Sequence, residues 1–252
     1  MNKYITIFAL WAFSSLTFAS CEGLAEKLNA ELYPIENGTA RDLRFSNCKV
    51  WPFDPSKTIV VLVHFKEGSS IAVPPNDTEG LYDLTVLLVT SDAGKILNRL
   101  SQVNAFTSDA IMLDGIAIDT APYKLGQNLR AFGVRATFNN SSSVSSWEHS
   151  QIALYVTQDN KLKQVLERLV VNNKRYEQVD DCIETLVNIN RTLSISSTSS
   201  FGFADLLVKE KMVVDEGKKE SSDCKVTNRM MTKDYILHFD GTTYVVPEEM
   251  RY

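Results

Sequence analysis

Thr58-Ile59-Val60-Val61-Leu62-Val63-His64-Phe65 is the stretch of this sequence that decides the fold. Its β-branched and apolar residues favour an extended strand with its side chains buried. Residues 81–90 have the same character, and residues 96–100 return after Ser91-Asp92-Ala93-Gly94, which has the composition of a turn. The sequence therefore predicts a group of neighbouring antiparallel strands here.

Further strand-like runs follow along the chain, and the predicted ranges are 111–118, 130–138, 151–157, 162–171 and 203–214. Gly133 interrupts the second of these runs, which predicts a β-bulge there. Residues 161–169 also fit helical spacing, but Val170 and Val171 continue the apolar run and favour a strand. Gln158-Asp159-Asn160-Lys161 predicts a hairpin turn before it. We interpret Ser196–Ser200 as a polar patch and residues 216–223 as a charged loop.

The C-terminal region carries a hairpin signal. Asp240-Gly241 separates Tyr235–Phe239 from Thr242–Val246, and an Asp-Gly pair between two β-rich runs favours a tight turn. Gly241 would supply a positive φ at little cost. Alternation places Tyr235, Leu237 and Phe239 on one face, which we expect to be buried because it is wholly apolar or aromatic.

The fold class that follows is mainly β, with antiparallel sheets in a sandwich- or barrel-like arrangement and one short N-terminal helix. About ten strands follow one another with no helix between them, which favours antiparallel pairing. The helix is predicted for residues 22–32, where leucines recur at every fourth position. We expect a main domain at 21–175 and a C-terminal subdomain at 176–252, or one continuous domain.

Residues 1–20 have the pattern of a secretory signal peptide. Lys3 gives a positive start, residues 4–13 form a short apolar core, and small residues follow up to Ser20. We therefore expect an exported protein, periplasmic or associated with the outer membrane of a Gram-negative bacterium. No later apolar run approaches the ~20 residues that a membrane-spanning helix needs.

Cys21 directly follows the predicted cleavage point and has two alternative fates. Phe18-Ala19-Ser20-Cys21 is similar to a bacterial lipobox, with Phe18 where that motif usually has Leu. A lipid on Cys21 would be the contact with the membrane and would leave Cys48 as an odd thiol. Otherwise the four cysteines, Cys21, Cys48, Cys182 and Cys224, can form disulfides.

Proximity along the chain favours Cys21–Cys48 together with Cys182–Cys224 among the three connectivities that four cysteines allow. No Cys-x-x-Cys pair and no His at metal-ligand spacing is present, so we expect neither a zinc site nor a redox motif, and no cofactor. The formal net charge of −5 and the mixed charge distribution give no reason to expect a nucleic-acid partner.

Few residues suggest a binding or catalytic role. Trp147 and Tyr155 are candidate binding residues, because aromatic side chains stack on ligands, and Trp147 is expected in an exposed loop. Trp51 is interpreted as a packing anchor. Carboxylates beside apolar runs motivate a carboxylate-dependent hydrolase as an alternative, and they are Asp83, Asp109, Asp114, Asp119 and Asp205. No Gly-x-Ser-x-Gly motif occurs.

Several segments together resemble one group of exported proteobacterial β-rich proteins without an assigned reaction. They are Asn47–Pro52, Thr107–Ala110, Ile118–Tyr123, Arg130–Arg135, Phe203–Val208 and Phe239–Tyr244. The resemblance implies a periplasmic or envelope location and supplies no catalytic residue. We expect a non-catalytic envelope protein that binds a partner protein or a small ligand on a β scaffold. The alternative is a secreted, glycosidase-like hydrolase.

Overall fold

The structure is a computed structural model that describes residues 21–35, 41–66, 80–140, 142–180, 182–220 and 223–251. The predicted signal peptide therefore lies outside the described residues. Helix α1 (Cys21–Leu32) precedes a four-stranded antiparallel sheet with the order β1-β2-β3-β4. Its strands are β1 (Leu43–Val50), β2 (Lys57–Lys66), β3 (Gly80–Thr90) and β4 (Ile96–Ser108).

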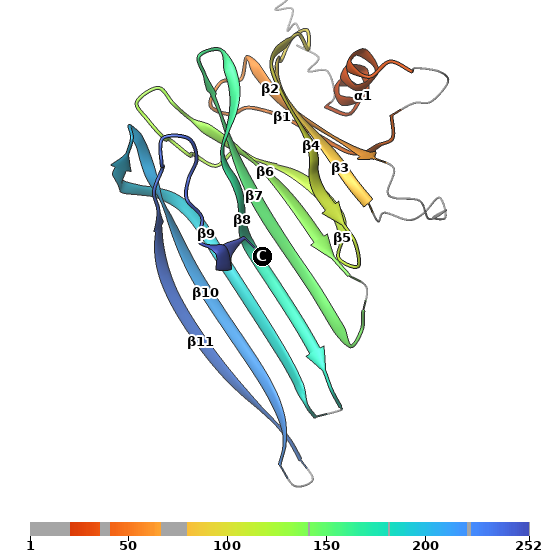
Figure 1. The fold of residues 1–252 in the computed structure, drawn as a ribbon, viewed down its shortest axis with the longest axis vertical. Helices are drawn as coiled ribbons and strands as arrows, with labels where there is room; N and C mark the ends of the chain where they lie inside the picture. The colour runs from red at the N-terminus through yellow and green to blue at the C-terminus, as the bar shows by residue number, and fades with distance from the viewer. Residues whose placement is uncertain are drawn as a thin grey trace, which may run out of the picture.

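The second sheet has seven antiparallel strands in the order β11-β10-β9-β8-β7-β6-β5 (Figure 1). Its strands are β5 (Met112–Asp119), β6 (Ala131–Asn139), β7 (Ser145–Gln158), β8 (Lys161–Gln178), β9 (Glu184–Ser200), β10 (Phe203–Glu220) and β11 (Asp223–Leu237). A 3-10 turn, η1 (Glu248–Met250), lies close to the C-terminus. The prediction of a mainly β protein with antiparallel sheets and one short helix is confirmed, but the sheets do not close into a barrel.

The small sheet is buried on both faces, which explains its continuous apolar strands. Along β2, Ile59, Val61 and Val63 face the large sheet. The alternate residues Val60 and Leu62 pack against α1. Because neighbouring side chains of a strand point to opposite faces, a strand covered on both sides contains apolar residues at every position.

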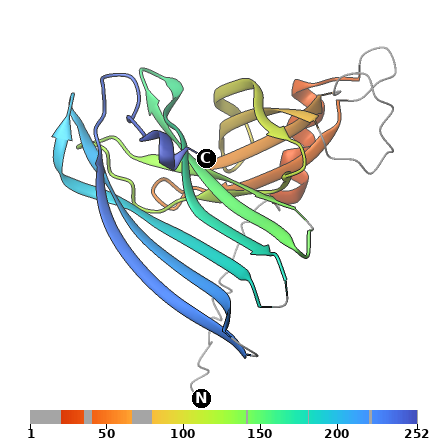
Figure 2. The ribbon, with the colours of Figure 1, turned by 60° about the horizontal axis from the view of Figure 1, so that its bottom comes forward.

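The two sheets form a sandwich over strands β5, β6 and β7. Phe132 on β6 is fully buried and contacts the ring of Trp51, with centroids 5.7 Å apart, and the ring of Tyr155, 5.8 Å away. Trp51 is itself 5% exposed, so its interpretation as a packing anchor is confirmed. Strands β8 to β11 extend beyond the small sheet, as Figures 1 and 2 both show.

The large sheet divides between β8 and β9. These strands pair only over residues 172–178 and 184–190. Beyond that region an apolar core fills the space between them, and it includes Leu166, Leu206, Leu237 and Tyr244. Residues of the β5–β6 connection and of the C-terminal segment pack into the same core. The C-terminal segment therefore takes part in the fold rather than hanging free.

Several local predictions are confirmed. Residues 162–171 lie in strand β8, and Asp159 and Asn160 both have positive φ at the β7–β8 turn. That backbone geometry suits a two-residue hairpin because it matches the twist of the strands. Gly133, in contrast, is paired regularly on both sides, so the predicted bulge is wrong. A Cβ at this position would come within 2.8 Å of the Cδ1 of Ile152, so a close neighbour accounts for the glycine.

The predicted charged loop at 216–223 is wrong in most of its length, since β10 continues to Glu220 and β11 begins at Asp223. The polar patch Ser196–Ser200 is the end of β9, a strand that we did not predict. Both regions lie at or beyond the limits of the apolar cores. β10 pairs with β11 through residues 216–220, whereas β9 bulges at residues 196–198 opposite Asp205. The exposed residues there, such as Thr198, Ser199 and Lys218, are polar, so no alternation of apolar residues marks these strands.

The predicted C-terminal hairpin is reduced to a tight turn. Gly241 has a φ of +101°, as expected, and the Oδ1 of Asp240 accepts the N–H groups of Thr242 and Thr243. Pairing is limited to one bridge between Phe239 and Tyr244, so the extended strand pair is wrong. The preceding residues through Leu237 belong to β11 and pair with β10 instead. Leu237 and Phe239 are buried, as the alternation predicted, whereas Tyr235, the third residue of that face, is only half-buried.

The predicted boundary at 175/176 falls inside β8, and the seven-stranded sheet continues across it. Separate folding of the two parts stays a prediction. Both expected disulfides are present. Cys21 is bonded to Cys48, with Cα atoms 5.5 Å apart. Of the two predicted fates of the Cys21 sulfur, a disulfide or a lipid, the structure therefore contains the disulfide.

Candidate functional site

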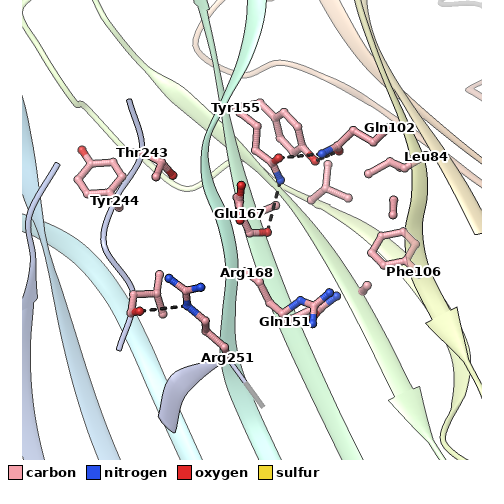
Figure 3. Close-up of a pocket in the computed structure, with 16 residues that line it drawn as sticks. Leu84, Gln102, Phe106, Gln151, Tyr155, Glu167, Arg168, Thr243, Tyr244 and Arg251 are labelled. Carbon is pink, nitrogen blue, oxygen red and sulfur yellow. Dashed lines mark hydrogen bonds between the residues drawn. The ribbon is translucent and has the colours of Figure 1, made fainter. Parts of the chain in front are cut away.

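A cavity of about 330 Å³ lies where three parts of the chain meet. One side is β4 at the edge of the small sheet, and the opposite side is the C-terminal segment (Figure 3). The strands β6, β7 and β8 supply the residues between them. The cavity therefore combines residues as far apart in the sequence as Leu84 and Arg251.

One part of the cavity lining is apolar. Leu84 on β3 and Phe106 on β4 come from the small sheet, while Val134 and Ala136 come from β6 and Ala153 from β7. Leu84, Phe106, Val134 and Ala136 are buried members of the core between the two sheets. The cavity is thus continuous with a packed, rigid sandwich.

Another part of the lining is a chain of hydrogen bonds. The hydroxyl of Tyr155 donates to Oε1 of Gln102 at 3.0 Å, and Nε2 of Gln102 donates to Oε1 of Gln164 at 2.7 Å. Tyr155 is fully buried, and this burial raises the pKa of its hydroxyl above the usual value. The phenol therefore stays protonated at neutral pH and acts as a donor.

Three charged side chains complete the lining: Glu167 and Arg168 on β8, and Arg251 near the C-terminus. Glu167 and Arg168 are consecutive exposed residues in a strand. The pairing of β8 with β7 is irregular at three places, and at each of them β8 has one extra residue. Such a bulge interrupts the alternation of side chains, which explains the two consecutive exposed residues. Arg251 donates through Nε to the carbonyl oxygen of Val246 at 3.1 Å.

The C-terminal side of the cavity is held in place by hydrogen bonds to two strands. The N–H of Tyr244 and the hydroxyl of Thr243 both donate to the carbonyl oxygen of Val165, at 2.8 and 3.0 Å. The Tyr244 hydroxyl donates to the carbonyl oxygen of Ala204 at 2.6 Å. Burial raises the pKa of Tyr244, and the nearby carboxylate of Asp205 adds to this effect.

The two predicted binding residues lie apart. Tyr155 lines the cavity, whereas Trp147 does not. Trp147 is part of strand β7, so its placement in an exposed loop is wrong. The run of serines before it hid the strand, because serine is common in turns. Gln102, Gln164, Arg168 and Arg251 were missed, and no local motif marks them.

The candidate aspartates are dispersed rather than paired across the cavity. Asp114 is exposed on β5. Partners of the other four are Arg41 for Asp83, the Ile111 N–H for Asp109, Arg135 for Asp119, and Thr198 with His238 for Asp205. Burial opposes ionisation of Asp119, but hydrogen bonds from Ala121 N–H and Arg135 outweigh it and lower its pKa. Glu167 is the one carboxylate among the described residues that line the cavity.

Ser200, His238 and Asp205 meet at the end of the β9–β10 hairpin. Nδ1 of His238 lies 3.1 Å from Oδ2 of Asp205 and 3.3 Å from the hydroxyl oxygen of Ser200. A catalytic triad needs the acid on one ring nitrogen and the serine on the other. Since both contacts here involve Nδ1, this cluster does not have the geometry of a triad.

The histidines do not form a metal site in the part of the chain that the structure describes, where no group of three His, Cys, Asp or Glu residues has metal-binding geometry. His64 is buried instead beneath α1, with Nε2 2.6 Å from Oδ1 of Asn29. Its ring also packs edge-on against Tyr33.

We expect His64 to make the protein less stable as the pH falls. Burial lowers the pKa of His64 to about 4, with a further contribution from Arg41. The unfolded chain, with a histidine pKa near 6.5, then binds a proton that the folded chain does not. The free energy of unfolding should therefore fall by about 2 kcal/mol between pH 7 and pH 5. Urea unfolding of wild type and His64→Gln checks this, and equal pH slopes would contradict it.

Comparisons with protein families, with curated proteins and with solved structures found no match. Among the described residues, no helix combines the length and the apolar character needed to cross a lipid bilayer. The two disulfides indicate an oxidising compartment outside the cytoplasm.

Proposed function

We propose that this chain is an exported binding protein of the cell envelope whose cavity takes a small amphipathic anion. The observation that carries the proposal is the composition of the cavity lining. One side is apolar, with Leu84 and Phe106, and the other brings two arginines, Arg168 and Arg251, against a single carboxylate, Glu167. Neither arginine forms an ion pair with a carboxylate among the described residues.

The size and construction of the cavity support a small ligand. Its volume of about 330 Å³ lies at the lower end of the range typical of ligand pockets, about 300–1,000 Å³. The Tyr155–Gln102–Gln164 hydrogen bonds fix polar groups on a rigid sheet, which reduces the cost of ordering them on binding. An acyl chain would lie against the sandwich, and an anionic head group would face the arginines.

The export part of the proposal rests on the pattern of residues 1–20 and on the resemblance to exported proteobacterial proteins. The disulfides agree with that location. The preference for binding over hydrolysis rests on the carboxylates. Glycoside hydrolysis by the usual mechanism uses two facing carboxyl groups, whereas the cavity lining contributes one.

Calorimetric titration of the exported, disulfide-bonded chain with octyl phosphate tests the proposal. Octanol and inorganic phosphate are the matched probes, because each carries only one of the two parts. We expect octyl phosphate to bind more tightly than either. Ala153→Leu, which fills the cavity, and Arg251→Gln, which removes a head-group charge, should each weaken binding about tenfold or more.

Arg229→Gln is the control, because Arg229 lies on β11 and pairs with Glu216 away from the cavity. Its affinity for octyl phosphate should equal that of wild type. Binding that is unchanged in Ala153→Leu would place the ligand elsewhere and overturn the proposal, as would the absence of binding to wild type.

A further inference from the structure

One face of strand β7 continues from the cavity to an aromatic and cationic cluster. Gln151, Ala153 and Tyr155 line the cavity. Because side chains alternate along a strand, Trp147 and His149 point to the same side. The irregularities in the β7–β8 pairing place the extra residues in β8, so the alternation of β7 is not interrupted. The cavity and the cluster therefore lie on the same face of the large sheet.

Strand β8 adds an arginine to this cluster in a fixed position. Arg175 is the direct pairing partner of Trp147, and its guanidinium carbon lies 4.3 Å from the centre of the indole ring. The indole Nε1 donates to Oδ1 of Asn173 at 2.8 Å, which orients the ring. His149 stacks on the buried ring of Phe138 at 4.8 Å. Trp147 thus holds the guanidinium of Arg175 against one face of its ring.

The charges on this face are unevenly compensated. Arg191 pairs with Glu210 and Arg229 with Glu216 further across the same face. Arg168 and Arg175, by contrast, form no ion pair with any carboxylate in the described ranges of the chain. Arg168 and Arg251 line the cavity, and Arg175 lies further along β8, in a chain whose formal net charge is −5.

The electrostatic field at His149 agrees with this uneven charge. Burial lowers the pKa of His149, and the positive charges of Arg168 and Arg175 lower it further. Two guanidinium groups therefore act on the same imidazole from β8. A region that disfavours a further positive charge favours a bound anion by the same interaction.

We infer that Arg175, held against the ring of Trp147 beside His149, forms a second subsite that binds a phosphate or carboxylate group, next to Arg168 of the cavity lining. Guanidinium groups suit both anions because their planar donors bond two oxygens at once. In combination with the cavity, the subsite would take a second anionic group of an elongated ligand. For such an elongated ligand, the inference rests on the proposed function. Binding of a free anion to the subsite, however, does not require a ligand in the cavity.

NMR titration of the mature, disulfide-bonded chain with sodium phosphate tests this inference. A separate titration with sodium acetate tests a carboxylate in place of the phosphate. The indole signal of Trp147 reports on the subsite, and that of Trp51, buried in the sandwich, is the internal control. We expect phosphate to shift the Trp147 signal and not the Trp51 signal. Arg175→Gln should weaken this binding about tenfold, the loss expected for one charge-assisted contact.

The remaining variants separate the two proposals. Arg229→Gln, a paired arginine on the same face, and Ala153→Leu, a cavity variant, should both keep the phosphate affinity of wild type. The stronger of the phosphate and acetate responses identifies the anion class. A Trp147 signal that does not move with either anion, or that moves equally in Arg175→Gln, would overturn the subsite, even if octyl phosphate still binds in the cavity.

Discussion

Replacing Phe132 by alanine is expected to lower the free energy of unfolding by about 3–5 kcal/mol, the range for truncating a large buried aromatic residue. Phe132 is fully buried on β6 and contacts Trp51 from the other side of the sandwich and Tyr155 from the neighbouring strand. Its removal would leave a void between the two sheets. The rigid β-sheet backbone closes such a void poorly, so the lost contacts are not recovered.

Guanidinium unfolding followed by tryptophan fluorescence measures the effect, since Trp51 lies beside the substituted ring. Phe201→Ala is the matched control, because Phe201 is 77% exposed at the β9–β10 turn. That variant should change stability by less than about 0.5 kcal/mol. A similarly small change for Phe132→Ala would show that the two sheets do not depend on this contact.

The same packing explains which strands could be predicted from the sequence. Residues 58–65 and 81–90 are apolar at nearly every position because the small sheet is covered by α1 on one side and by the large sheet on the other. A strand in that setting needs no information from distant residues to be recognised. The turn at Asp159-Asn160 was also predictable, because these residues tolerate positive φ.

Strand β9 and the ends of β10 and β11 could not be predicted in this way. They extend beyond the small sheet, and their side chains are mostly exposed or half-buried. A charged or Ser/Thr-rich strand there is stabilised by its neighbours through ladder hydrogen bonds. Composition alone does not distinguish such a strand from a loop. The C-terminal hairpin failed for a related reason, since β10 is the stronger partner for residues up to Leu237.

The candidate site was predictable only in part. Tyr155 could be predicted as a binding residue because it is an aromatic residue in a β protein, and it does line the cavity. Trp147 was selected for the same reason, but its ring positions Arg175. The residues that give the cavity its chemistry come from β4, β8 and the C-terminus. Their meeting depends on the division of the large sheet between β8 and β9, which is a long-range property of the fold.

Removing the Cys182–Cys224 disulfide is expected to cost about 4 kcal/mol of stability. The bond closes a loop of 42 residues, with Cα atoms 5.1 Å apart, and chain entropy gives a cost of this size for the loss of such a cross-link. It joins the β8–β9 connection to the start of β11 at the far end of the large sheet, beyond the part that the four-stranded sheet covers (Figure 1). The cross-link therefore replaces the packing that this end lacks.

Cys182→Ala/Cys224→Ala should lower the midpoint of guanidinium unfolding and speed amide hydrogen exchange at Leu186 and Val213, which lie in β9 and β10 near the bond. Exchange at Val61, in the sandwich, should change less, because local opening of the far end leaves that core closed.

The Cys21–Cys48 bond joins α1 to β1 at the opposite end of the molecule. Cys21→Ala/Cys48→Ala is therefore the matched control, since it should leave exchange at Leu186 as it is in wild type. If the Cys182/Cys224 variant keeps both its midpoint and its exchange rates, the strands beyond the sandwich are stable through pairing alone, and the disulfide is not what holds them together.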